Sequence, residues 1–151
     1  RDWSSDVCSS DLFVHLIESN NNWRVVNIPS KHKPADEQEP LFMGDPATRW
    51  EGDTFVIETI SFDTKAWIQS NGWYKTDDTK ITERFRRPSK NYLEYQYTVE
   101  DPNTLEKPWT SSWRQFSLGD TSGQTLTENF CTNNENVEQF MKLVQQEREK
   151  K

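Results

Sequence analysis

The sequence predicts a mainly β fold, an antiparallel meander that closes into a lipocalin-like barrel or a curled sandwich, with one C-terminal helix. Three observations lead to this prediction. Runs of alternating apolar and polar residues dominate the middle of the chain. Turn-forming residues separate consecutive runs, as in hairpins. After Glu135 the apolar spacing changes to that of one helix face.

The alternating runs predict six to eight strands. Short polar connections at 19–22, 52–53 and 88–91 favour antiparallel hairpins, and Trp50 is expected to anchor the core. Residues 31–40 follow neither period and are expected to form a loop. The predicted strands cover 13–18, 23–28, 49–52, 54–61, 80–87, 92–100 and 109–118.

The predicted helix begins near Glu135. Val137, Phe140, Met141 and Val144 lie at i, i+3, i+4 and i+7, which places them on one helix face. Thr132 precedes Glu135 by three residues, the spacing of a capping box. We therefore expect this helix to pack on the sheet.

The composition fits one globular domain. The chain has 151 residues, of which 13% are aromatic, so a few large rings can build its core. The formal net charge of −7 repels a phosphate backbone, and nucleic acid is not an expected partner. No apolar run is long enough for a membrane helix, so we expect no membrane partner either.

The first twelve residues differ in character from the rest. The string RDWSSDVCSSDL resembles the translation of a common sequencing adapter, and residues 1–12 are therefore interpreted as a non-native leader. The native domain is then expected to comprise residues 13–151 and to be truncated at its N-terminus. Cys8 belongs to this leader, so Cys131 is expected to be a free thiol.

Several ordered motifs follow between Phe13 and Met141. They include HLIESNNNWR at 15–24, RWEGDT at 49–54, ERFRR at 83–87, DPNTLEKPWT at 101–110 and CTNNE at 131–135. With these motifs the chain resembles a family of uncharacterised exported bacterial proteins, frequent in acidobacteria and in metagenomic soil lineages. The resemblance implies a secreted or periplasmic protein and implies no activity. Many relatives have a Gly-His-Pro-His-like loop where this chain has GWYK at 72–75, so a role of those histidines would not transfer.

Common catalytic and cofactor signatures are absent from the sequence. Only His15 and His32 are present, without a CxxC or HExxH spacing, so we expect no metal site and no cofactor. Nucleophile elbows and phosphate-binding glycine loops are also missing.

Carboxylates within aromatic strands are the remaining candidates. Glu83 shares a strand face with Ile81 and Phe85, where burial would raise the pKa of a carboxyl group toward the range of a general base. The favoured alternative is a structural ion pair of Glu83 with an arginine, for which the sequence offers four candidates. These are Arg84, Arg86, Arg24 and Arg114.

Three hypotheses about function remain open. The first is an exported β-barrel that binds a small, partly apolar or aromatic ligand, such as a sugar or a phenolic compound; the second is a cofactor-independent lyase, isomerase or hydrolase; the third is a structural or interaction module. The loop 31–40 and the segment 67–78 are the expected pocket mouth. Candidate catalytic residues are Glu83, Glu58, Tyr95 and His32, and candidate ligand-binding residues are Glu18, Arg24, Trp67, Tyr74, Tyr97 and Trp113.

Overall fold

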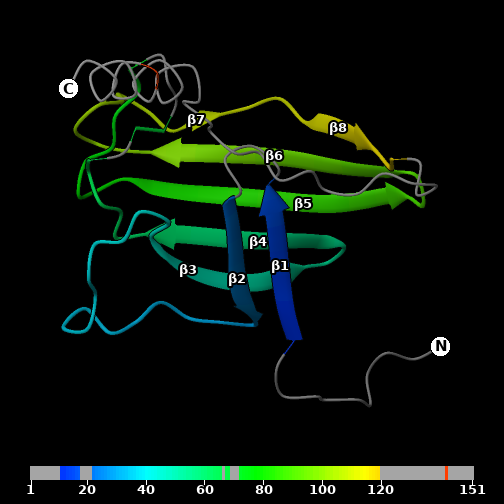
Figure 1. Cartoon of the computed structure of the whole chain (residues 1–151), viewed down its shortest axis with the longest axis horizontal. Helices are drawn as coiled ribbons and strands as arrows, with labels where there is room; N and C mark the ends of the chain where they lie inside the picture. The colour runs from blue at the N-terminus through cyan, green and yellow to red at the C-terminus, as the bar shows by residue number, and fades with distance from the viewer. Residues whose placement is uncertain (1–10, 18–21, 66, 69–71, 120–141, 143–151) are drawn as a thin grey trace. The chain divides into compact units, whose positions relative to one another are not determined.

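The fold is taken from a computed structural model that describes residues 11–17, 22–65, 67–68, 72–119 and 142. Within these residues, eight strands form two sheets. The two-stranded sheet contains β1 (Asp11–Ile17) and β2 (Asn22–Ile28), which run in opposite directions in Figure 1. The six-stranded sheet contains β3 (Asp45–Glu51), β4 (Thr54–Ile60), β5 (Lys80–Ser89), β6 (Tyr92–Glu100), β7 (Trp109–Thr110) and β8 (Arg114–Ser117).

Contacts along the chain define two units. The main unit comprises residues 1–15 and 24–124, and contains the whole six-stranded sheet. The second unit comprises residues 16–23 and 125–151, of which the structure describes only 16–17, 22–23 and 142. The predicted C-terminal helix and Cys131 lie outside the described residues.

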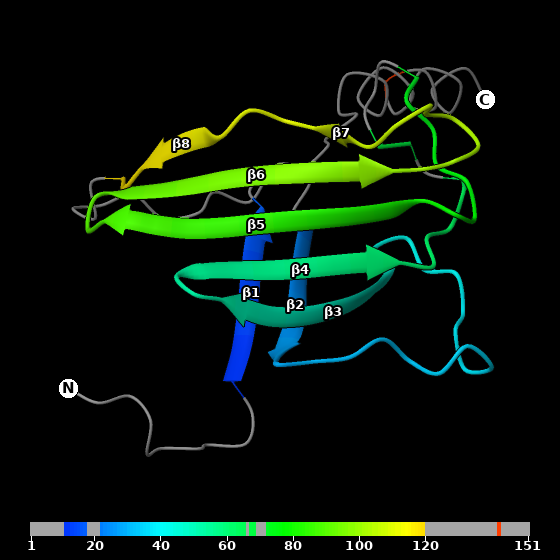
Figure 2. The same ribbon diagram turned by 180° about the vertical axis from the view of Figure 1, so that it is seen from behind.

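The six-stranded sheet is an antiparallel meander. Its strand order is β3, β4, β5, β6 and β7, with β8 pairing on the same edge of β6 as seen in Figures 1 and 2. The turn at Gly52 and Asp53 joins β3 to β4, since Glu51 pairs with Thr54. Among the described residues the sheet is open, with β3 at one edge, and these strands do not close into the predicted barrel.

The edge beside β6 contains a β-bulge. On β6, Thr98 faces Thr110 and Tyr95 faces Arg114, so four residues of the edge span the length of three on β6. Ser111 lies at this irregularity, where its N–H donates to the Tyr97 carbonyl over 2.9 Å. The extra residue splits the predicted strand 109–118 into β7 and β8, and it reverses the alternation of side chains between them.

One face of the sheet is aromatic and is here called the inner face. It is defined by residues paired across β4, β5 and β6, whose register places them side by side. Neighbouring rings on this face lie close together: the centroids of Phe85 and Tyr95 are 4.9 Å apart, and those of Tyr95 and Tyr97 are 5.8 Å apart. The inner-face residues are Phe55, Ile57, Thr59, Ile81, Glu83, Phe85, Tyr95, Tyr97 and Val99.

Residues of β1 and β2 that belong to the main unit cover part of the inner face. Val26, only 4% exposed, packs with Phe55, Ile57 and Phe85 in the buried core cluster, and Phe13 packs against that cluster. Beyond the end of β2, Ser30 forms two backbone hydrogen bonds with Thr48 of β3, both 3.1 Å long. These contacts fix β2 on the sheet, and β2 also provides Arg24.

Two sequence expectations need correction here. Trp50 is not a core anchor, because it is 60% exposed, although its ring centroid lies 5.2 Å from that of Phe55. The first strand begins at Asp11 and so includes two residues of the interpreted leader. No helix within the described part of the chain is long and apolar enough to cross a membrane.

Candidate functional site

A cavity of about 300 Å³ opens on the inner face beside the buried core. The strands contribute Thr59, Ile81, Glu83, Tyr95 and Tyr97, and β2 contributes Arg24. Segments that follow β2 and β4 complete the wall. These contribute Phe42, Met43, Phe62, Trp67, Ile68 and Lys75. We call this cavity the aromatic pocket.

A charged pair lies in the wall of the aromatic pocket. The Arg24 guanidinium donates from Nη1 to Glu83 Oε2 over 2.6 Å and from Nη2 to Oε1 over 2.8 Å. The Tyr95 hydroxyl donates to the same Oε1 over 3.0 Å. Both charged side chains are about nine-tenths buried, at 12% and 11% exposure, so the two bonds compensate charges that water hardly reaches. This geometry matches the ion-pair interpretation of Glu83, with Arg24 as the partner.

Tyr95 donates a hydrogen bond to Glu83 and keeps its own proton in this arrangement. Burial raises the pKa of the Tyr95 hydroxyl well above its ordinary value of 10, and the neighbouring Glu83 charge and hydrogen bond raise it further. His15 lies at the same core, with its ring centroid 6.1 Å from that of Phe85. Burial lowers the pKa of His15, and the positive charge of Arg24 lowers it further.

Lys75 is the main pocket residue that the sequence candidates did not include. It is only 6% exposed, and its Nζ lies 4.7 Å from the centroid of the Phe62 ring, a cation–π contact. The same Nζ lies 3.5 Å from the Phe42 carbonyl oxygen. Burial lowers the pKa of Lys75, while the charge of Asp63 partly opposes this shift. The pocket therefore holds a second cation besides Arg24.

A glycine positions the loop that forms one side of the pocket. Gly44 has φ of +69°, and a Cβ at this position would lie 2.5 Å from the Thr59 side chain and 2.6 Å from the Ile60 carbonyl. Leu41 anchors the same loop, because its N–H donates to Ser61 and its carbonyl accepts from Asp63. The close approach of Gly44 to β4 places Phe42 and Met43 at the pocket.

A buried aspartate holds the segment that contains Lys75. Asp101, 3% exposed, accepts hydrogen bonds from the Thr79 hydroxyl over 2.5 Å, from the Thr76 hydroxyl over 3.0 Å and from the Asn103 N–H over 3.0 Å. Burial alone would raise the pKa of Asp101, but these hydrogen bonds outweigh it and hold the pKa below its ordinary value. The network fixes the chain just after Lys75 to the end of β6.

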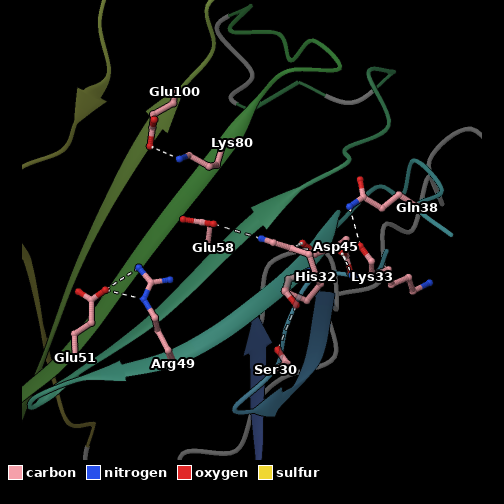
Figure 3. A network of polar contacts seen from close by, with 11 residues as sticks. Ser30, His32, Lys33, Gln38, Asp45, Arg49, Glu51, Glu58, Lys80 and Glu100 are labelled. Carbon is pink, nitrogen blue, oxygen red and sulfur yellow. Dashed lines mark hydrogen bonds and ion pairs between the residues drawn. The ribbon is translucent and has the colours of Figure 1, made fainter. Parts of the chain in front are cut away.

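The candidate pair Glu58 and His32 lies outside the aromatic pocket. Glu58 alternates with the inner-face residues of β4, so it projects from the opposite face. Figure 3 shows His32 between Glu58 and Asp45. His32 Nε2 is 3.4 Å from Glu58 Oε1, and Nδ1 is 3.0 Å from the Asp45 carbonyl oxygen. These contacts tie the loop that follows β2 to β3 and β4.

The structure brings only part of the candidate set together. Trp113 lies on the other face, where it stacks on Arg86 at 4.0 Å, and Tyr74 is 53% exposed and does not line the pocket. Glu18 lies outside the described residues. Trp67, Ile68 and Lys75 of the segment 67–78 line the pocket, and no residue of the loop 31–40 is among its lining residues. Candidates that line the aromatic pocket are Arg24, Trp67, Glu83, Tyr95 and Tyr97.

The described residues contain no group of three or more His, Cys, Asp or Glu side chains that could hold a metal ion. Comparison with known proteins adds no assignment, since no family model, no curated protein and no solved structure matches the chain.

Proposed function

We propose that this domain is an exported module that binds a small, partly apolar or aromatic molecule in the aromatic pocket. The observation that supports the proposal is the cavity itself, about 300 Å³ in volume and lined by the rings of Phe42, Phe62 and Trp67 together with a few polar groups. Ligand sites in proteins typically combine such apolar walls with a small number of placed polar groups. The resemblance to exported bacterial proteins supports the location outside the cytoplasm.

The rim of the pocket supports the same proposal. Phe42 is 63% exposed, Trp67 is 59% exposed and Met43 is 46% exposed. Each of these side chains leaves apolar surface in water that a bound ligand would cover. Binding would therefore remove apolar area from water with little rearrangement of the sheet below.

The enzyme alternative has weaker support from the geometry. Both oxygens of Glu83 accept hydrogen bonds from Arg24, and Oε1 also accepts one from Tyr95, so three of the about four acceptor positions of this carboxylate are already used. Tyr95 directs its proton at Glu83, and its raised pKa makes proton release unfavourable. His32, the other candidate donor, contacts Glu58 on the opposite face. The third hypothesis, a structural or interaction module, would be supported by a fully packed interior. The presence of the cavity therefore argues against it.

The proposal is tested by screening simple phenols and monosaccharides for binding by thermal shift and ligand-observed NMR. Compounds that bind the native chain should bind Trp67→Ala several-fold more weakly, because Trp67 lines the pocket. Trp23→Ala is the matched control, since Trp23 is similarly exposed, at 66%, and does not line the pocket. Equal effects of the two substitutions, or turnover of any compound, would contradict the proposal of a simple binding site at this place.

A further inference from the structure

We propose that the ligand of the aromatic pocket is a one-ring aromatic carboxylate whose anionic group is bound by Lys75. This inference rests on the proposed binding function and specifies the chemical class of the ligand. It depends on three features of the pocket: an uncompensated cation, an unpartnered hydroxyl and a small apolar volume.

The uncompensated cation is Lys75. Arg24 and Glu83 are joined by two hydrogen bonds, so their charges offset each other within the pocket wall, while the buried Nε of Arg24 has no hydrogen-bond partner among the described residues. Among the described residues, no carboxylate lies within ion-pair distance of Lys75, although Asp63 is near enough to act on its charge. The pocket lining therefore has an excess positive charge in a chain whose net charge is −7.

The ammonium group of Lys75 has N–H donors that are not used in hydrogen bonds within the described part of the chain. An ammonium group offers three N–H donors. Within the described part of the chain, the ammonium group makes a long hydrogen bond of 3.5 Å to the Phe42 carbonyl and contacts the face of the Phe62 ring. A carboxylate can accept the remaining donors, and hydrogen bonds between two charged groups are stronger than those between neutral groups.

A hydroxyl in the same lining lacks a partner within the described part of the chain. Thr59 is 2% exposed, and its Oγ1 is buried without a hydrogen bond. A buried polar atom of this kind is unfavourable unless something pairs with it. Thr59 lines the pocket together with Lys75, and its hydroxyl can donate to an anionic oxygen.

The remaining lining sets the size and character of the ligand. Apart from the polar groups named above, the wall is formed by aromatic and aliphatic side chains, among them Met43, Ile68 and Ile81. The volume of about 300 Å³ is at the small end of ligand pockets. One ring with one carboxylate matches both the apolar part of the wall and the one uncompensated cation among the described lining residues.

The inference is tested with pairs of acids and their neutral amides. The probes are benzoate with benzamide, phenylacetate with phenylacetamide, and cinnamate with cinnamamide, titrated at pH 7 by calorimetry or ligand-observed NMR. At least one acid should bind the native chain about tenfold more tightly than its amide. Because each pair has the same ring, the difference isolates the charge.

Two substitutions locate the effect. Lys75→Met keeps the length of the side chain and removes the charge, and it should weaken the acid about tenfold while leaving the amide unchanged. Lys107→Met is the matched control, because Lys107 is exposed and does not line the pocket. Unchanged amide binding also shows that the Lys75→Met protein is folded.

The possible failures are distinguishable. Amides that bind as tightly as acids, or acid binding that survives Lys75→Met, would overturn this inference and leave the binding proposal intact. Failure of all acids and amides would overturn the inference alone if a phenol or sugar still bound in the pocket. Failure of those compounds as well would remove both proposals. The comparison of acid with amide in the native chain needs no variant, so it holds even if Lys75→Met does not fold.

Discussion

Substitution of Glu83 by glutamine should destabilise the domain far more than the same change at an exposed ion pair. The carboxylate compensates the Arg24 guanidinium through two hydrogen bonds, and both side chains are about nine-tenths buried. Breaking a buried pair by removing one partner typically costs about 3–5 kcal/mol, because the other charge stays buried and unpaired. Since each side chain keeps about a tenth of its exposure, we expect a loss near the lower end, about 3 kcal/mol.

The assay is urea denaturation with the transition followed by circular dichroism. Glu51→Gln is the matched control, because Glu51 also pairs with an arginine, over 2.7 Å to Arg49, but both side chains are 45% exposed. An exposed pair contributes about 0–1 kcal/mol, so this control should change the midpoint little. Equal losses for the two substitutions would refute the argument that the Arg24–Glu83 pair is a buried structural element.

A double-mutant cycle separates the pair from other contacts of Glu83. Replacement of both partners, Arg24→Met with Glu83→Leu, removes both charges, and such apolar replacements are often neutral or stabilising. The double variant should therefore be more stable than either single variant. If the two losses simply add, Glu83 acts through another contact, of which the Tyr95 hydrogen bond is the first candidate.

Three further outcomes follow from other parts of the structure. Gly44→Ala should lose at least about 2 kcal/mol in urea denaturation, because a Cβ would clash with β4, whereas Gly52→Ala, with positive φ but open space, should lose only about 1 kcal/mol. Asp101→Asn should cost about 2 kcal/mol at pH 7 from the lost charged hydrogen bonds. Because folding lowers the pKa of Asp101 below 3.8, the extra stability of the native chain over Asp101→Asn should be lost as the pH falls through the folded-state pKa. A difference in unfolding free energy that persisted at lower pH would contradict the role given to the charged Asp101 carboxylate. Deletion of residues 1–12 should leave the thermal midpoint unchanged, since Asp11 and Leu12 are exposed in β1; a drop of several degrees would show that the leader contributes to folding.

Local alternation predicted most of the sheet correctly. The inward position of Glu83 follows from a period of two, and the structure places this residue, 8% exposed as a whole, on the same face as Phe85. Period two is reliable in these strands because their pairing continues without a shift. Between β4 and β5 the pairs run from Thr54–Arg86 to Thr59–Ile81, and between β5 and β6 from Lys80–Glu100 to Arg86–Glu94. Alternation alone could not identify Arg24 as the partner, because that contact joins two different sheets.

The positions of the candidates that do not line the aromatic pocket have physical causes as well. Trp109 and Trp113 would share a face in a regular strand, but the bulge at Ser111 reverses the alternation and turns Trp113 toward Arg86. The sequence did not indicate that Lys75 is a pocket residue, because a lysine in a polar segment is normally exposed. Its burial depends on Phe62 and on the network around Asp101, which are distant in sequence. Contacts of this kind cannot be read from local patterns.

Lys75→Met should stabilise the domain in the absence of ligand, and this separates a functional lysine from a structural one. Burial lowers the pKa of Lys75 below 10.5, so the charged form is less favourable in the folded chain than in the unfolded chain. The penalty is present in full below the folded-state pKa, declines as the pH rises above that value, and vanishes above the unfolded value. A methionine of similar length still packs on Phe62, so we expect a gain of up to about 1 kcal/mol at pH 7 that shrinks toward zero above pH 10.5. Urea denaturation of both proteins at pH 7 and at a pH above 10.5 measures this difference. A loss of stability at pH 7 would mean that the contacts of the Lys75 ammonium group with Phe62 and Phe42 outweigh the cost of burying its charge. Lys75 would then stabilise the pocket itself and would not be a binding residue for an anion.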